Sequence, residues 1–270
     1  MDKNIFDIIV DSIYIARKRI MEIFRKDIAS RSLRRNISGD ITRYIDIVSE
    51  KSIIDFLKKG LKSFSILSEE AGFRKYGADY PLIIIDPIDG SFNASRGIPL
   101  FSISIAVAYG DTINDIVFGA VCNIATGDIY TGYKDKGAYL NNIPIERNIR
   151  GFRPVASIAL SQNIYPKINK FIRRSLDKGW KIRVIGSSSL EICMVADRSI
   201  DAYIDVRNVL RISDIAAGIL ILKESKGYIY NKNVFNEIFL GEKRYNIIAT
   251  NSLSLLDEIL AILDFTNKSY

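Results

Sequence analysis

The stretch Pro81-Leu-Ile-Ile-Ile-Asp-Pro-Ile-Asp-Gly-Ser91 decides the fold, because it predicts a buried strand that ends in acidic residues. Its apolar residues are mostly β-branched and favour a strand in the core, and Pro87 is expected to end the sheet ladder at Asp86. Asp89 follows three residues after Asp86. The Gly90-Ser91 pair then predicts a flexible turn whose backbone N–H groups can face an anion. Carboxylates therefore stand next to donors of the kind that bind phosphate.

Two further segments place acidic residues at the end or the start of a regular element. Upstream, the strand-like run 64–67 is followed by Glu69 and Glu70. Downstream, Asp214 begins a segment of apolar and small residues, 215–218, that predicts a helix. Each of these acids alone is ordinary turn chemistry. Together, the three segments predict a metal site whose ligands are divided along the chain.

This pattern resembles the magnesium-dependent inositol monophosphatase and fructose-1,6-bisphosphatase superfamily. Its motif Asp-Pro-Ile/Leu-Asp-Gly-Thr/Ser is met by residues 86–91, and its later helix start, of the type Asp-x-Ala-Gly/Ala-Gly, is met by residues 214–218. A Glu-Glu pair precedes the first motif, as in the family. The version Leu-Arg-Ile-x-Asp at 210–214, without a Trp before the Asp, is most similar to the archaeal, dual-substrate branch. The resemblance spans nearly the whole chain.

The resemblance implies an α/β fold, a layered αβαβα sandwich of the sugar-phosphatase type. Helical spacing of apolar residues predicts amphipathic helices at 5–24 and 42–59, and a meander of strands after residue 100 predicts antiparallel sheet. From residue 154 strands and helices alternate. We therefore expect an N-terminal α+β domain over 1–150 with the main metal motif, and a C-terminal α/β domain over 151–270 that contributes Asp214 and substrate contacts.

Composition excludes several kinds of site. The chain of 270 residues is 48% hydrophobic, enough for one compact body, and it contains no His. Ser-His-Asp and Cys-His catalysis and His-ligated zinc are therefore excluded. Cys122 and Cys193 lie in apolar runs and predict buried free thiols in a reducing compartment. Because no run approaches the length of a membrane span and the N-terminus is no secretory signal, we expect a cytoplasmic protein with no membrane partner.

The net charge of +7 favours acidic partners, either phosphorylated metabolites or nucleic acid. Apart from a cluster at Arg31, Arg34 and Arg35, the basic residues are spread along the chain, and no basic stripe with interleaved aromatic residues is visible. We therefore predict a small phosphorylated metabolite as the partner and no nucleic acid. The resemblance further implies a homodimer.

Glu69, Asp86, Asp89 and Asp214 are the candidate metal ligands. Two carboxylates about 4 Å apart repel by roughly 4 kcal/mol at an effective dielectric constant near 20, so their convergence calls for a divalent cation. With no His or Cys nearby, ligation by oxygen alone selects Mg²⁺ or Mn²⁺ over zinc. The alternative is that these acids are solvated turn residues that share no site.

The family's roles imply two or three Mg²⁺ ions per subunit, with Mn²⁺ as a substitute. Glu69, Asp86 and the Ile88 carbonyl would hold the first ion, and Asp86, Asp89 and Asp214 the second. Glu70 implies a third, looser site. Glu69 and Asp86 are thus also catalytic residues.

The same resemblance assigns the phosphate side of the site. The hydroxyl of Ser91 would orient the attacking water together with Glu69, and the N–H groups of Gly90 and Ser91 would bind the phosphate at a helix N-terminus. Asp40 and Asp46 correspond to residues near the metal centre, with helix capping as the alternative.

Substrate contacts are implied for Asp89, Gly90, Ser91 and Asp214, and for three residues of the second half: Ser187, Asp205 and Arg207. The spacing Ser188-x-x-Glu191 also predicts a capping box, which accounts for the serines without a substrate. Arg207 is a candidate for a second phosphate pocket together with Arg211, Arg183, Lys167 and Tyr165, with surface charge as the alternative for each.

The expected function is magnesium-dependent hydrolysis of phosphomonoesters by metal-activated water, with inositol 1-phosphate as substrate and fructose 1,6-bisphosphate as a further candidate. One alternative keeps the metals and changes the substrate to a nucleotide, 3′-phosphoadenosine 5′-phosphate or NADP. Another is a non-catalytic homologue that binds nucleic acid or protein through its basic surface.

Overall fold

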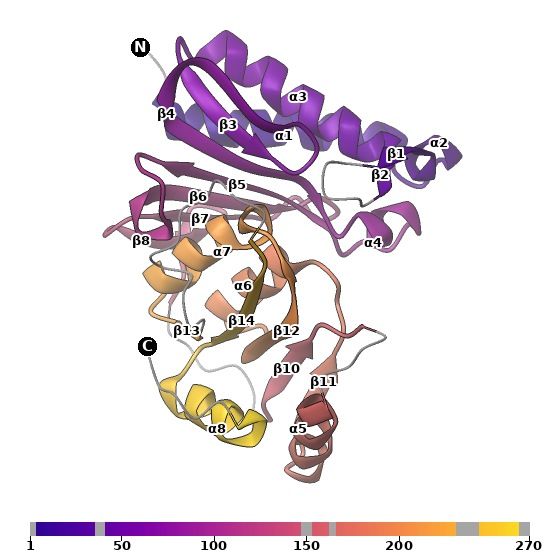
Figure 1. Cartoon of the computed structure of the whole chain (residues 1–270), viewed down its shortest axis with the longest axis vertical. Coiled ribbons are helices and arrows are strands. Elements are labelled where there is room, and N and C mark those ends of the chain that lie inside the picture. Colours follow the sequence, from indigo (N-terminus) through magenta and orange to yellow (C-terminus); the bar gives the residue numbers. More distant parts are fainter. Residues whose placement is uncertain (1–3, 36–40, 147–152, 162–165, 231–242, 265–270) are drawn as a thin grey trace.

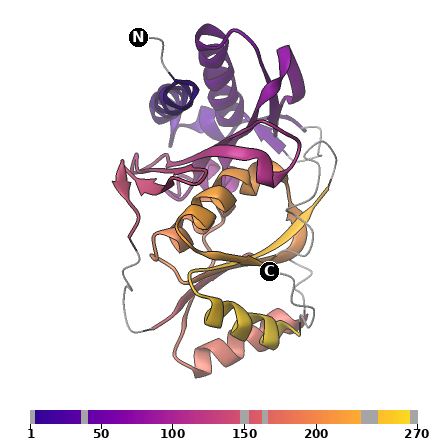
Figure 2. The same ribbon diagram turned by 90° about the vertical axis from the view of Figure 1, so that its left-hand side faces the viewer.

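The computed structural model describes residues 4–35, 41–146, 153–161, 166–230 and 243–264. Its layers alternate in the order helices, sheet, helices, sheet, helices, as Figures 1 and 2 show. This confirms the predicted αβαβα sandwich. The boundary expected near residue 151 falls on residues 147–152, outside the described residues, and stays a prediction.

The first layer consists of α1 (Ile5–Ile23) and α3 (Tyr44–Gly60), which pack against each other and cover one face of the first sheet. Both predicted helices are confirmed, although the second begins two residues later than expected. Between them lie a short helix and a two-stranded sheet: α2 (Asp27–Ser30), β1 (Ser32–Arg35) and β2 (Ile41–Arg43).

The first sheet has seven strands in sequence order. They are β3 (Phe64–Ser68), β4 (Gly72–Asp89), β5 (Ser102–Ala108), β6 (Ile116–Asn123), β7 (Ile129–Tyr133), β8 (Gly137–Leu140) and β9 (Ile143–Pro144). Two short helices lie between strands: α4 (Ser91–Ser95) and the 3-10 helix η1 (Ile113–Asp115). From β4 to β9 all neighbours pair antiparallel, as the meander predicts.

Side chains alternate across β4 and so reach two cores. Ile83 and Ile85 pack among the residues of α1 and α3, whereas Leu82 and Ile84 face the helices of the middle layer. Because successive side chains of a strand point to opposite faces, a strand covered by helices on both sides is apolar at every position. This explains the unbroken apolar run of the motif.

The prediction that this strand ends at Asp86 is wrong, because β4 continues to Asp89. Asp86 lies opposite Ser104 and Asp89 opposite Ser102, so two residues of β4 face one residue of β5. This is a β-bulge, and Pro87 occupies it, where its missing N–H interrupts no ladder hydrogen bond. The bulge turns the strand end toward α4 and spaces the two aspartates.

The second sheet has five strands in the order β11-β10-β12-β14-β13. The elements of this half are β10 (Val155–Ile158), α5 (Pro166–Asp177), β11 (Lys181–Arg183), α6 (Ser188–Ala196), β12 (Ala202–Leu210), α7 (Ile212–Glu224), β13 (Tyr228–Tyr230), β14 (Tyr245–Thr250) and α8 (Leu253–Leu263). β10 is parallel to both neighbours and the other pairs are antiparallel. α5 and α8 cover the outer face.

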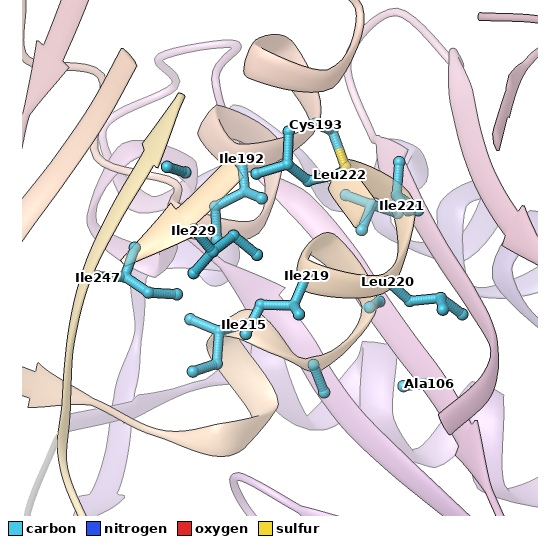
Figure 3. Packing of buried hydrophobic residues seen from close by; sticks show 14 of the residues in the cluster. Ala106, Ile192, Cys193, Ile215, Ile219, Leu220, Ile221, Leu222, Ile229 and Ile247 are labelled. Atoms are coloured by element: carbon cyan, nitrogen blue, oxygen red, sulfur yellow. The ribbon is translucent and has the colours of Figure 1, made fainter. Parts of the chain in front are cut away.

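The middle layer consists of α6 and α7, packed between the two sheets (Figures 1 and 3). Figure 3 shows side chains of both helices meeting Ile229 and Ile247 of the second sheet. On the other side, α7 lies so close to the first sheet that a Cβ on Gly119 would lie 2.9 Å from the Ala217 carbonyl oxygen. α7 is therefore fixed against the sheet that carries the acidic motif.

Cys122 and Cys193 are buried and free, as predicted. Among the described helices, none combines the length and the apolar character that crossing a membrane requires.

Candidate metal centre

Strand pairing brings Glu69 next to Asp86. β3 is parallel to the second part of β4, with Ser68 opposite Ile85, so the residues that follow each strand meet at one edge. The Glu69 N–H donates to the Ile85 carbonyl at 3.2 Å. Ser68 also lies opposite Gly72, so the Glu69-Glu70 pair forms the tip of a tight turn directly beside the motif.

Asp214 reaches the same place from the other half of the chain, in the first turn of α7. Its Oδ2 accepts the backbone N–H of Arg211 at 2.8 Å, which caps the helix. Three carboxylate oxygens, one each from Glu69, Asp86 and Asp214, lie within 4.8 Å of one another. In the described part of the chain this is the one such group of acidic or cysteine side chains. The predicted convergence of three of the four acids is thus found.

These carboxylates are costly to keep charged. Burial, together with the neighbouring carboxylates, raises the pKa of Asp86 and of Glu69 well above the usual values. Burial also raises the pKa of Asp214 to about 6, although the Arg211 N–H and guanidinium oppose the shift. Clustered oxygen ligands whose charges repel form a donor set that fits a hard divalent cation. The residues therefore fit the predicted Mg²⁺.

Arg211 supplies a positive charge inside the site. Its Nη1 forms an ion pair with the Glu69 carboxylate, and both side chains are largely buried. Arg211 therefore faces the acidic group in this geometry. Of the other candidates for a second phosphate pocket, Arg183 is exposed, whereas Tyr165 and the Lys167 side chain lie outside the described residues.

Asp89 lies beside this group but is held by α6. Its Oδ2 accepts hydrogen bonds from the hydroxyls of Ser187 at 2.8 Å and Ser189 at 2.6 Å, and from the Ser189 N–H at 2.7 Å. The Ser102 hydroxyl adds a longer contact, and the Ser188 N–H donates to Oδ1 at 3.0 Å. Oδ1, which takes a single donor here, is the atom that remains for a metal.

Ser187 therefore does not face the cavity, where a substrate contact was predicted. It is fully buried, and its hydroxyl holds Asp89. The predicted capping box is also wrong. The N-cap of α6 is Ser187, not Ser188, and the Glu191 carboxylate accepts the N–H groups of Gly186 and Ser187 at 3.2 and 3.0 Å.

Ser91 links the motif to α3. Its hydroxyl lies 3.0 Å from Oδ1 of Asp46 and 2.9 Å from the Ile88 carbonyl oxygen, the predicted metal ligand. Oδ2 of Asp46 accepts the Arg43 N–H at 2.6 Å. Asp46 thus both caps α3 and reaches the site, and burial raises its pKa to about 7. Asp40 lies outside the described residues.

A cavity of about 610 Å³ opens over the acidic group. Gly90 and Ser91 line it, as predicted, and Gly90 has φ 92°, which side-chain-bearing residues rarely adopt. Arg207 also lines it, whereas Asp205 is fully buried and bonded by Arg207 through Nε at 3.0 Å and Nη2 at 2.6 Å. Asp205 therefore orients Arg207 instead of facing the cavity.

Comparison with known proteins places this geometry in a family. The model of the inositol monophosphatase family matches residues 2–265. The chain belongs to the inositol monophosphatase family. This member of the family is a phosphomonoesterase.

Individual relatives of this inositol monophosphatase homologue agree. It is 34% identical over 254 residues to the fructose-1,6-bisphosphatase/inositol-1-monophosphatase of Archaeoglobus fulgidus. This match covers 89% of this chain and 94% of the relative. It is 31% identical to the bifunctional NADP phosphatase/NAD kinase of Methanocaldococcus jannaschii, over 84% of this chain and 46% of that protein. A solved structure from Pyrococcus horikoshii, described as similar to inositol-1 monophosphatase, superposes with a TM-score of 0.79 at 30% identity, covering 98% of this chain and 99% of that one.

Sequence reasoning named Asp46 but missed Ser49 and Glu50, which lie on the same face of α3 and brace the acidic motif. The Ser49 hydroxyl donates to the Pro87 carbonyl at 2.7 Å, and the Glu50 carboxylate accepts the Ala71 N–H at 2.9 Å and the Ser68 hydroxyl. Asp46, Ser49 and Glu50 are spaced i, i+3, i+4 and lie on one buried helix face. Polar residues that interrupt an apolar stripe at this spacing were the available signal.

Proposed function

We propose that this inositol monophosphatase homologue is a Mg²⁺-dependent phosphomonoesterase that hydrolyses inositol 1-phosphate, with fructose 1,6-bisphosphate as a further substrate. The observation that carries the proposal is the convergence of the Glu69, Asp86 and Asp214 carboxylates at the base of a cavity. The dual-activity relatives support the choice of substrates.

Glu69, Asp86 and Asp214 would hold the metal, with the Ile88 carbonyl and Oδ1 of Asp89 as further oxygen ligands. Two or three Mg²⁺ ions, or Mn²⁺ in their place, fit this oxygen-rich set. When bound, such ions stabilise the charge that develops on the phosphoryl oxygens and lower the pKa of a bound water.

The residues of the chain then position the reactants. The N–H groups of Gly90 and Ser91 lie at the start of α4, where they can hold the phosphate oxygens. The Ser91 hydroxyl, which donates to Asp46, can accept the proton of an attacking water as it passes its own proton to Asp46. With a pKa near 7, Asp46 is poised to take that proton at neutral pH.

Phosphate release from inositol 1-phosphate and fructose 1,6-bisphosphate, with and without added Mg²⁺, tests the proposal. We expect Asp214→Asn to lower kcat by at least about a hundredfold, since it removes a charge that acts on the transition state through the metal. Asp177→Asn, an exposed acid at the end of α5, is the matched control. Metal-independent turnover, or full activity of Asp214→Asn, would refute the proposal.

A nucleotide phosphatase is the second candidate, since the NADP phosphatase/NAD kinase relatives match most of this chain. A non-catalytic binding homologue is disfavoured by the intact acidic group, and Mg²⁺-dependent turnover would exclude it. The cytoplasmic location and the homodimer stay predictions.

A further inference from the structure

Another cavity, of about 310 Å³, lies at the opposite end of α4 from the cavity over the acidic group. It is formed where α2 packs against α4, and Figure 1 shows these two short helices close together. Gly90 and Ser91, at the start of α4, line the cavity over the acidic group, whereas Ala94, Ser95 and Arg96 line this one. Among the described residues, the two cavities share no lining residue. We call the smaller cavity the α2–α4 pocket.

The α2–α4 pocket is lined by three positively charged side chains, those of Arg25, Lys26 and Arg96. Asp27 is the one acid among its described lining residues, so the lining carries a net charge of +2. Within the described part of the chain, none of the three cations forms an ion pair or a side-chain hydrogen bond. Like charges gathered at one cavity repel one another, and an anion that enters the cavity removes this cost. The positive charge of the pocket is therefore available to a ligand.

Arg25 occupies a backbone position at which glycine is usual. α1 ends at Ile23 with Phe24 as its C-cap, and Arg25 follows with φ 65°, in the left-handed region. Glycine is the common residue just after a helix C-cap because it has no Cβ to clash in this conformation. The local structure at the end of α1 therefore does not account for an arginine, and the reason for it has to lie in its side chain.

Two contacts direct the Arg25 side chain along the α2–α4 pocket. Its guanidinium carbon lies 5.4 Å from the centre of the Phe24 ring. Its Cγ lies 3.4 Å from the point that a Cβ on Gly97 would occupy, so the stem of Arg25 runs over the chain directly after α4. The Gly97 N–H in turn donates to the Ala94 carbonyl at 3.2 Å, which fixes this part of the chain against α4. Arg25 and Arg96, 71 residues apart in sequence, are thus brought to one cavity.

We propose that the α2–α4 pocket binds the phosphate group of a small dianion, at a site separate from the catalytic one. A guanidinium group donates in a planar fork that matches the oxygens of phosphate, and a lysine adds a point charge. Three cations suit a doubly charged phosphate better than a singly charged carboxylate. A volume of about 310 Å³ admits free phosphate or a phosphate that carries a few carbon atoms. This site does not depend on the proposed function.

Calorimetric titration of the full chain with inorganic phosphate, at constant ionic strength, tests the proposal. A metal chelator is present, so that the carboxylates of Glu69, Asp86 and Asp214 repel phosphate from the other cavity. We expect saturable binding of phosphate and a Tm that rises with the phosphate concentration. Glycerol 3-phosphate, titrated in the same way, distinguishes the two sources of the phosphate group. Tighter binding than that of inorganic phosphate assigns a phosphorylated metabolite to the pocket, and equal or weaker binding assigns free phosphate.

Arg25→Gly/Arg96→Gln should weaken phosphate binding by at least about tenfold, because it removes two charge-assisted contacts. Glycine fits the left-handed conformation of residue 25, so this substitution should not lower the Tm measured without phosphate. The matched control is Lys226→Gly/Arg173→Gln, which removes the same charge away from the pocket. Lys226 follows α7 with φ 65°, and Arg173 is an exposed residue of α5. The control should bind phosphate as the wild type does.

A second variant, Lys26→Gln, changes an exposed side chain of the same pocket and should weaken phosphate binding several-fold. The inference is overturned if the wild type shows no saturable binding, or if Arg25→Gly/Arg96→Gln and Lys26→Gln bind phosphate as tightly as the wild type. Equal weakening in the control would overturn it as well, since the overall charge of the protein would then account for the binding. Phosphate release from inositol 1-phosphate tests the proposed function separately, because none of these substitutions touches a residue of the candidate metal centre.

Discussion

Ser189 donates twice to one carboxylate oxygen of Asp89, through its N–H at 2.7 Å and its hydroxyl at 2.6 Å. This contact joins the first turn of α6 to the end of β4, elements 100 residues apart in sequence. Asp89 is therefore set in place by α6, and with it the one oxygen, Oδ1, that can turn toward a metal.

Ser189→Ala should lower kcat several-fold, because Asp89 loses one of its two bonds from Ser189 and is less firmly oriented. Second contacts of metal ligands typically contribute about 10- to 100-fold in metal affinity or activity, and here the N–H bond remains. The activity should recover partly at high Mg²⁺. Ser225→Ala, which removes a hydroxyl bonded to the Leu222 carbonyl in α7, is the control. If the activity of Ser189→Ala depends on the Mg²⁺ concentration as that of the wild type does, Ser189 does not orient Asp89 for metal binding.

Asp46→Asn should lower kcat by about a hundredfold while changing KM little, since the amide cannot take the proton from Ser91. The helix cap should survive, because Asn still offers an oxygen to the Arg43 N–H. Steady-state kinetics and thermal unfolding of the same variant separate the two roles. A kcat within a few-fold of the wild type would assign Asp46 to capping alone.

Glu191→Gln should make stability less dependent on pH. Burial raises the pKa of Glu191 from 4.5 to about 7, so between these values the folded state binds a proton that the unfolded state has lost. The wild type therefore loses stability as the pH rises through this window, by at most about 3 kcal/mol. Gln stays neutral at every pH. The free energy of unfolding of Glu191→Gln, measured with denaturant, should therefore rise relative to that of the wild type between pH 5 and pH 8. If the difference in free energy of unfolding between Glu191→Gln and the wild type is the same at pH 5 and pH 8, the pKa of Glu191 is not raised.

Mg²⁺ should raise the Tm, and more strongly at pH 8 than at pH 5. Without metal, the raised pKa of Asp214, about 6, means that stability is lost as its carboxyl ionises with rising pH. A cation binds the ionised carboxylates and competes with protons, contributing about 2.7 kcal/mol at a hundred times its Kd. Asp86→Asn should abolish most of this shift, and Asp177→Asn should keep it. An equal shift in Asp86→Asn would place the metal elsewhere.

Gly119→Ala should destabilise the fold by more than about 1 kcal/mol, because its Cβ would lie 2.9 Å and 3.0 Å from backbone atoms of Ala217 in α7. Gly60→Ala is the contrast, since the atoms nearest to its Cβ belong to the side chain of Ile8, with Cγ2 at 2.9 Å, and not to a backbone. Denaturant unfolding of both variants checks the difference. If Gly119→Ala is as stable as Gly60→Ala, α7 is not held rigidly against the sheet.

Local sequence patterns were enough to predict much of the candidate metal site. Glu69, Asp86 and Asp214 were predictable because each stands where a regular element ends or begins, and such ends gather at the edges of layers. The five-layer fold followed from the resemblance, and strand and helix periodicity agreed with it. The end of β4 was misplaced because a proline blocks a regular ladder but is accommodated in a bulge, which only pairing with β5 reveals.

The sequence by itself determined the chemistry available to this protein: a chain without His, with acids at the ends of its elements and a Gly-Ser turn beside them, is suited to hard metals and phosphate. Only the tertiary structure decided which groups face the cavity. Ser187 and Asp205 carry the right chemistry, yet both are buried, because one bonds Asp89 and the other Arg207. Such partners are chosen by the packing of α6 and α7 between two sheets, a long-range outcome that local periodicity does not encode.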